Sequence, residues 1–275
     1  MEVRMKGKRF EGEVVLITGS TRGIGRALAE AFSREGAKVL VNGRDAEGAE
    51  RVAEEIRKGG GEAEAVGADI ADPQAVKELI RRGVEAFGGI DVLVNNAGVS
   101  LPPQPAEEVE PHGLDKIMAV NLKGAFLCSR EVFPVMRERG GGRIVNVSSQ
   151  AGLFGEPGLM PYCVSKAALL CLTRCLAYEW APYGIRVNAV APGFVAGGMN
   201  EPVLRHEALV NTLSSRVPLK RFARVHEVVE AVLFLAMKDS YVNGEVLVVD
   251  GGMSGYRTPS ILELVGKGRK KRKEV

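Results

Sequence analysis

Short runs of valine, leucine and isoleucine recur along the chain and alternate with longer stretches of mixed polarity. The short runs predict strands at 13–18, 38–42, 62–69, 91–96, 143–149, 186–192 and 245–250. Apolar runs of this kind suit strands that are covered on both faces. The longer stretches, such as 25–36 and 72–88, have the spacing of amphipathic helices.

Strands that alternate with helices predict βαβ units and a parallel sheet. No Pro/Gly/Ser-rich linker divides the chain, and no internal repeat is visible. We therefore expect an α/β fold, a single doubly wound domain with a mainly parallel sheet of about seven strands. The region from Gly193 to about Arg224 has no strand signal. A long insertion after a strand end usually forms a lid or specificity loop.

The first predicted strand runs directly into a glycine-rich turn, TGSTRGIG (18–25). Glycines at 19, 23 and 25 permit a tight turn and let backbone N–H groups approach a pyrophosphate at the N-terminus of the next helix. Because the turn follows a strand and precedes an amphipathic helix, it favours dinucleotide binding over an ordinary loop.

Tyr162 and Lys166 stand four residues apart in a helix predicted from PYCVSKAALL (161–170). This spacing places both side chains on one helix face. A phenol with its ordinary pKa of about 10 is a poor base at neutral pH. A nearby ammonium would lower that pKa. Taken in isolation, the pair favours an ordinary surface contact.

Taken together, the motifs resemble the short-chain dehydrogenase/reductase family. The resemblance rests on TGSTRGIG (18–25), NNAG (95–98), Asn121 in AVNLKGAF, VSS (147–149), YCVSK (162–166), APG (191–193) and VDGG (249–252), in the family's order over about residues 11–253. It implies a Rossmann-type domain at 11–254 that includes a substrate lid at 194–224, followed by a basic tail at 255–275. It also implies a homotetramer that pairs through the helix of Tyr162 and through the C-terminal strand.

The resemblance further implies a catalytic set of Asn121, Ser149, Tyr162 and Lys166. Tyr162 would exchange a proton with the substrate oxygen beside Lys166, and Ser149 would hydrogen-bond that oxygen. Asn121 would hold a water molecule of a proton relay. Ser148 competes for the serine role, but it would point to the opposite face of its strand.

NAD-specific members of the family carry an acidic residue at the end of the second strand, where this chain has Gly43 followed by Arg44. An arginine can bind a 2′-phosphate, and Arg22 is a second cation in the glycine turn, so we expect NADP(H). The contacts that the resemblance implies are Gly19, Thr21, Arg22, Gly23, Ile24, Gly25, Arg44, Asp69, Ile70, Asn95, Ala97, Gly98, Tyr162, Lys166, Pro192, Gly193 and Val195. Gly197 stands where relatives carry a threonine. Either Asn200 replaces the missing hydroxyl or the cofactor binds more weakly.

Two substrate classes stay open. The motif set resembles 3-oxoacyl-carrier-protein reductases, and the apolar lid favours a 3-oxoacyl-type or other hydrophobic ketone. The phrases NGRD, PGLMPY and YVNGEVLVVDGG resemble gluconate 5-dehydrogenases and favour a sugar acid or polyol. A non-catalytic nucleotide-binding module is a remote third alternative, because such modules often lose the tyrosine or the lysine.

Charge and composition narrow the partners. The net charge is +3, but six basic residues lie in 267–273, so the rest of the chain is slightly acidic and shows no nucleic-acid footprint. No apolar run approaches the roughly 18 residues of a membrane span, and the charged N-terminus is not a secretory signal. We expect a cytoplasmic enzyme with a small carbonyl or alcohol substrate. The histidines are scattered, so we expect no metal site, and we expect all four cysteines to be buried apolar residues.

Overall fold

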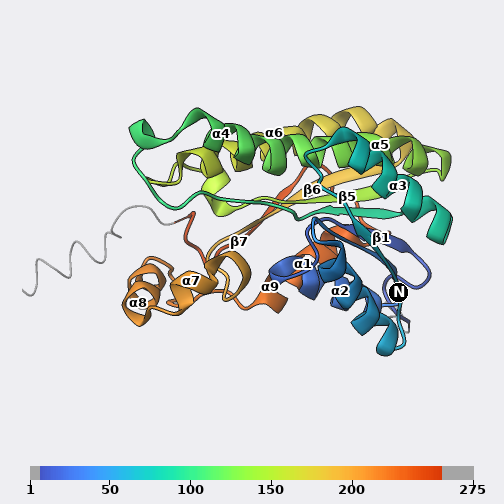
Figure 1. Cartoon of the computed structure of the whole chain (residues 1–275), viewed down its shortest axis with the longest axis horizontal. Helices are drawn as coiled ribbons and strands as arrows, with labels where there is room; N and C mark the ends of the chain where they lie inside the picture. Colours follow the sequence, from blue (N-terminus) through green and yellow to red (C-terminus); the bar gives the residue numbers. More distant parts are fainter. Residues whose placement is uncertain (1–6, 256–275) are drawn as a thin grey trace, which may run out of the picture.

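Seven parallel strands form one sheet through the middle of the molecule (Figure 1). A computed structural model describes residues 7–255. The strands are β1 (Val14–Ile17), β2 (Lys38–Gly43), β3 (Glu62–Gly67), β4 (Val92–Asn95), β5 (Gly142–Val147), β6 (Ile185–Pro192) and β7 (Val246–Val249). Each overlaps a predicted run, and their order is β3-β2-β1-β4-β5-β6-β7. The predicted single doubly wound α/β fold is therefore confirmed.

Helices cover both faces of the sheet (Figure 1). One face carries α1 (Gly23–Arg34), α2 (Ala46–Lys58) and α9 (Val225–Ala236). The other carries α3 (Pro73–Phe87), α4 (Pro111–Met118), α5 (Ala125–Glu138) and α6 (Met160–Trp180), and the π-helix Ala119–Gly124 joins α4 to α5. Within residues 7–255, no helix combines the length and apolarity needed to cross a membrane.

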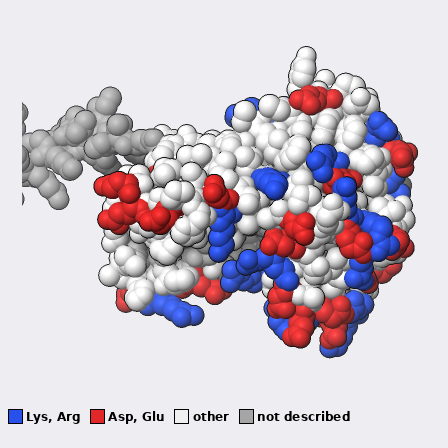
Figure 2. All heavy atoms as spheres, turned by 45° about the horizontal axis from the view of Figure 1, so that its top comes forward, with Lys and Arg blue, Asp and Glu red and all other residues white. Residues whose placement is uncertain are grey.

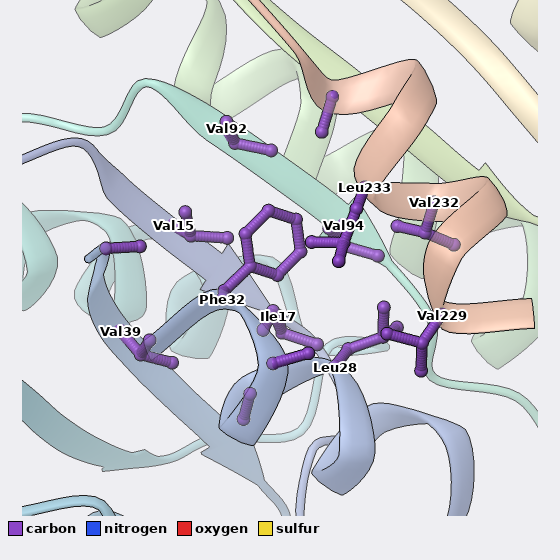
Figure 3. Packing of buried hydrophobic residues seen from close by; sticks show 14 of the residues in the cluster. Val15, Ile17, Leu28, Phe32, Val39, Val92, Val94, Val229, Val232 and Leu233 are labelled. Atoms are coloured by element: carbon purple, nitrogen blue, oxygen red, sulfur yellow. The ribbon is translucent and has the colours of Figure 1, made fainter. Parts of the chain in front are cut away.

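The core divides into two layers because strand side chains alternate between the faces of the sheet. Val15 and Ile17 of β1 pack with α1 and α9, whereas Leu16 packs with α3 and α5 on the opposite face. Figure 3 shows the first layer, in which the fully buried Phe32 ring of α1 lies near Val15 and other labelled valines. The alternation explains why the strands are apolar throughout.

Helix α3 shows how local signals set an element's ends. Pro73 is its first residue, and the Asp72 carboxylate accepts a hydrogen bond from the Gln74 amide at 2.9 Å. The helix ends at Gly88, whose φ of 81° is the left-handed conformation that favours glycine. Because both signals are visible in the sequence, the predicted helix 72–88 differs from the observed one by a single residue at each end.

The region without a strand signal contains two short helices, α7 (Glu201–Leu204) and α8 (Glu207–Ser215), which lie at one end of the molecule in Figure 1. Its two ends meet: Val195 and Ala223 form a parallel bridge, and the rings of Phe194 and Phe222 stack with centroids 5.3 Å apart. We call residues 194–224 the lid. The basic tail predicted at 255–275 lies outside the described residues apart from Gly255.

Two cysteine predictions are wrong. Cys128 and Cys163 are buried as expected, but Cys171 and Cys175 are exposed. Helix α6 buries residues such as Leu169, Leu170, Thr173, Leu176 and Ala177 against the sheet, which turns positions 171 and 175 outward. An apolar sequence on all sides of a helix does not reveal which side is buried.

Candidate active site

The glycine turn lies between β1 and α1, where the strand order reverses, since β1 pairs with both β2 and β4. Ligands of doubly wound folds bind at this point, beyond the carboxyl ends of the strands. A Cβ atom on Gly25 would come within 2.3 Å of the Gly19 carbonyl oxygen and 2.4 Å of the Asn96 amide nitrogen. The tight turn therefore requires glycine at this position.

Three buried or half-buried polar side chains, which sequence reasoning missed, hold this turn. The Asn96 side chain donates hydrogen bonds to the Thr18 and Gly19 carbonyls, both at 3.0 Å. The Thr18 hydroxyl accepts from the backbone N–H groups of Asn96 and Ala97 at 3.1 Å. The side-chain oxygen of Asn42 accepts a hydrogen bond from the Gly19 N–H at 3.4 Å. The available signal was that polar residues end otherwise apolar strands.

The end of β2 favours the phosphorylated cofactor. Gly43 is the last residue of β2, and a Cβ atom there would lie 2.4 Å from the Thr21 methyl carbon, so this backbone leaves no room for an acidic side chain. Arg44 follows directly and is exposed, and Arg22 is exposed at the start of α1. The nearby Asp45 carboxylate lies 3.6 Å from the guanidinium of Arg51 instead.

The other predicted cofactor residues lie around the same edge of the sheet. Ile70 and Val195 are buried, Pro192 is the last residue of β6, and the Asp69 carboxylate accepts from the Ala71 N–H at 3.0 Å. Asn95 is buried, and its side-chain amide donates to Asn146 at 2.8 Å and Ser129 at 3.1 Å. This side chain ties β4 to β5 and α5, so its contact with a cofactor stays a prediction.

Tyr162, Ser149 and Lys166 come together where β5 meets the first turns of α6. Tyr162 is partly buried, and Ser149 lies close enough to its hydroxyl to lower the pKa of the phenol. Lys166 is only 3% exposed, and its Nζ donates to the Val147 carbonyl at 2.8 Å. The same Nζ lies 5.7 Å from the centre of the Tyr162 ring. Tyr162 and Lys166 are therefore held inside the fold and do not form a surface contact.

The two neighbouring serines have different partners. The hydroxyl of the buried Ser148 donates to the Lys166 carbonyl at 2.9 Å, which binds the end of β5 to the backbone of α6. Ser149 instead faces Tyr162 and accepts from the Ala151 N–H at 3.1 Å. This arrangement supports Ser149 over Ser148 as the residue that contacts a substrate.

Asn121 lies in the π-helix between α4 and α5 and is 1% exposed. Its side-chain oxygen accepts from the Val99 N–H at 2.8 Å, and its nitrogen donates to the Val99 carbonyl at 2.9 Å and to Ser165 at 3.0 Å. A Cβ atom on Gly98 would lie 3.4 Å from Lys166 Nζ and 3.5 Å from the Asn121 oxygen. Asn121 therefore anchors the loop after β4 next to the lysine, and π-helical turns are frequent at functional sites.

Burial dominates the electrostatics of the pair. It raises the pKa of Tyr162 above the usual value for a phenol, and the hydrogen bond with Ser149 opposes the rise. Burial also lowers the pKa of Lys166 to about 8. The expected lowering of the tyrosine pKa by the lysine is therefore not found in this geometry. Tyr162 is a neutral acid, and Lys166 is still mostly protonated at neutral pH.

A narrow crevice, with no room for a water molecule in this structure, lies beside Tyr162. We call it the cleft. Its walls come from the loop after β4, from α4 and from the segment before α6, and no charged side chain lines it. The lining residues are Ser100, Leu101, Pro102, Gln104, Ile117, Gly158, Leu159, Pro161 and Tyr162. Among residues 7–255, no three His, Cys, Asp or Glu side chains gather as a metal-ligand set.

A doubly wound sheet with this glycine turn and a Ser–Tyr–Lys cluster defines a nucleotide-dependent oxidoreductase. Residues 19–254 match the family model described as enoyl-(acyl carrier protein) reductase. The chain belongs to the short-chain dehydrogenase/reductase family and is an oxidoreductase that acts on CH–OH groups.

Three relatives illustrate the similarity. An uncharacterized oxidoreductase of Thermotoga maritima is 44% identical over 88% of this chain and 98% of its own length. A 3-oxoacyl-(acyl-carrier-protein) reductase of the same organism is 40% identical over 89% of this chain and 99% of its own. The crystal structure of a gluconate 5-dehydrogenase from Burkholderia cenocepacia J2315, in complex with NADP and tartrate, superposes with a TM-score of 0.87 at 36% identity, covering 91% of this chain and 99% of that one.

Proposed function

We propose that the protein is an NADP(H)-dependent oxidoreductase that interconverts a 3-oxoacyl-type ketone and its secondary alcohol. The observation that carries the proposal is Tyr162, which lies beside Ser149 and lines an uncharged, mainly apolar cleft. A ketone carbonyl bound at Tyr162 would lie next to Ser149 as well, while its carbon substituents would face the apolar residues of the cleft, such as Leu101 and Leu159.

Each residue of the cluster has a distinct task. Ser149 donates a hydrogen bond to the substrate oxygen and orients the carbonyl. Tyr162 gives its proton to that oxygen as a hydride adds to the carbonyl carbon, and takes the proton back in the reverse direction. The positive charge of Lys166 stabilises the phenolate that forms. Asn121, held by Val99 and Ser165, supports the proton path behind the lysine.

The residues around the glycine turn fit a dinucleotide. When bound there, NADPH supplies the hydride and NADP⁺ accepts it. Arg44 and Arg22 would bind the 2′-phosphate, since Gly43 leaves no carboxylate to repel it. The proposal is supported by the similar gluconate 5-dehydrogenase that was crystallised with NADP.

A sugar acid is the second candidate substrate. It is favoured by the similarity to that gluconate 5-dehydrogenase, at a TM-score of 0.87. It is disfavoured by the cleft, because no cationic side chain lines the space beside Tyr162 where a carboxylate would need one. The full Ser–Tyr–Lys cluster argues against a non-catalytic module.

The test is NADPH oxidation with acetoacetyl-CoA, run beside NADP⁺ reduction with gluconate, with each assay repeated with the non-phosphorylated cofactor. We expect turnover of the thioester with NADPH. Turnover of gluconate alone would replace the ketoacyl assignment by the sugar-acid one. A preference for NADH would refute the role given to Arg44.

We further propose a homotetramer in the cytoplasm. Helix α6 exposes Val164, Cys171, Cys175 and Tyr178 on its outward side. In Figure 2, charged side chains of both signs crowd the end of the molecule that holds α2. Exposed free thiols suit a reducing compartment. Light scattering that finds a particle of 29.4 kDa, the mass of one chain, would refute the assembly.

A further inference from the structure

The lid touches the wall of the cleft through one ion pair. Arg216 follows the last residue of α8, and its guanidinium donates to the Glu156 carboxylate at 2.8 Å. Sixty residues separate the two along the chain. Glu156 starts the segment that leads into α6, and its carbonyl accepts from the Leu159 N–H at 3.0 Å. Since Leu159 lines the cleft, the ion pair joins the lid to the substrate side of the site.

The lid also rests on the glycine turn. A Cβ atom on Gly23 would lie 3.0 Å from Gly198 Cα, so the two backbones meet with no side chain between them. The Asn200 side chain holds the lid backbone near this contact by donating to the Val195 carbonyl at 2.9 Å. One end of the lid therefore lies on the predicted cofactor side, while Arg216 reaches the substrate side.

The base of the lid is held independently of Arg216. Phe194 stacks on Phe222, and the Arg221 guanidinium binds the Glu227 carboxylate at the start of α9 with two hydrogen bonds of 2.7 Å. Among the described residues 7–255, the stretch 201–216, which contains α7 and α8, forms a single ion pair with the rest of the protein. That ion pair joins Arg216 to Glu156. Breaking it would leave this base in place, together with the buried Val217 and the hydrogen bond from the Leu219 N–H to the Gly251 carbonyl at 3.3 Å.

We propose that Glu156 and Arg216 form a latch that closes the lid over the cleft and thereby sets how readily substrate enters and product leaves. The two are positioning residues, since neither belongs to the Ser–Tyr–Lys cluster. Their side chains are 17% and 42% exposed, so water screens the attraction between them in part. The role in substrate passage rests on the proposed function, whereas the closure itself does not.

Hydrogen exchange of the full-length protein with and without NADPH tests the closure directly. In Arg216→Gln and Glu156→Gln, we expect the amides of α7 and α8 to exchange about two to five times faster, as a partly exposed ion pair allows. The reversed pair, Arg216→Glu with Glu156→Arg, should restore slow exchange. Arg81→Gln is the matched control, because it removes exposed ion pairs with Glu78 and Glu85 on α3 and should leave the lid unchanged.

Unchanged exchange in both single variants, or a reversed pair that exchanges as fast as they do, would overturn the latch. Kinetics supply the second measurement: we expect KM to rise in the single variants while kcat holds or increases, because faster opening weakens substrate retention and speeds product release. A wild type that turns over no ketone would refute the proposed function and leave the exchange result standing. Normal exchange in active single variants would refute the latch alone.

Discussion

Lys166 Nζ donates a hydrogen bond to the Val147 carbonyl at 2.8 Å and lies 5.7 Å from the centre of the Tyr162 ring. The last residue of β5 thus holds the lysine, and the first turn of α6 holds the tyrosine. Two elements of the rigid core fix the distance between charge and phenol. This explains how a long, otherwise flexible side chain can keep one position.

Replacing Tyr162 with Phe tests the proton transfer. The variant keeps the ring and loses the hydroxyl, so we expect kcat to fall by about 10²- to 10⁴-fold, the range for loss of a general acid. Binding of NADPH, measured by its fluorescence, should stay unchanged. Tyr178→Phe is the matched control, since Tyr178 lies on the same helix and is 87% exposed. Turnover that survives in Tyr162→Phe would remove the tyrosine from the mechanism.

Replacing Lys166 with Met should stabilise the fold while abolishing activity. Burial lowers the pKa of Lys166 from 10.5 to about 8, so the folded state binds fewer protons than the unfolded state between these values. At pH 7, where both states are protonated, the buried charge costs about 3 kcal/mol. Loss of the hydrogen bond to Val147 in the variant offsets about 1 kcal/mol of the stability gained by removing this charge. We expect urea unfolding at pH 7 to show a net gain of about 2 kcal/mol.

The stability difference between the wild type and Lys166→Met should depend on pH. The free energy of unfolding of the wild type should rise relative to that of Lys166→Met as the pH increases from about 8 towards 10.5, where the folded state no longer carries the buried charge. Turnover should fall over the lower part of that range as the ammonium deprotonates. A stability difference that stays constant across this pH range would contradict the burial argument.

Replacing Arg44 with Ala tests cofactor choice. A charge-assisted contact with the 2′-phosphate is worth about 1.5–3 kcal/mol, so we expect the Kd of NADPH to rise roughly ten- to hundredfold. The Kd of NADH, which lacks that phosphate, should stay the same. Arg51→Ala provides the control, because Arg51 is an exposed arginine on α2 close to the same site. Equal weakening of both cofactors would mean that Arg44 does not read the phosphate.

Restoring the family's threonine at Gly197 should harm the protein. Gly197 has φ 140° and Gly198 has φ 58°, and residues other than glycine rarely adopt these backbone conformations. We expect Gly197→Thr to destabilise the fold by about 1–3 kcal/mol, measured by thermal unfolding, without tighter binding of NADPH. Gly155→Thr, at an exposed site where an added Cβ meets nothing within 4 Å, should cost much less.

The sequence left open what takes the place of the threonine hydroxyl at Gly197. A glycine in place of threonine suggested either a substitute contact from Asn200 or weaker binding of the cofactor. The nitrogen of the Asn200 side chain donates to the Val195 carbonyl and braces the lid, and a contact of Asn200 with the cofactor stays a prediction. The hydrogen-bond partner of a side-chain amide depends on the course of the backbone around it, and the sequence pattern does not predict that course.

The sequence by itself determined the strands, the helices, the glycine turn and the Tyr162–Lys166 spacing, because periodicity and turn chemistry act between residues close along the chain. The end of β2 at Gly43 and the signals that bound α3 belong to the same class. Only the tertiary structure decided which side of α6 is buried and how far burial shifts the pKa of Lys166. It alone brought Arg216 to Glu156, since contacts between distant residues arise from packing and leave no local pattern.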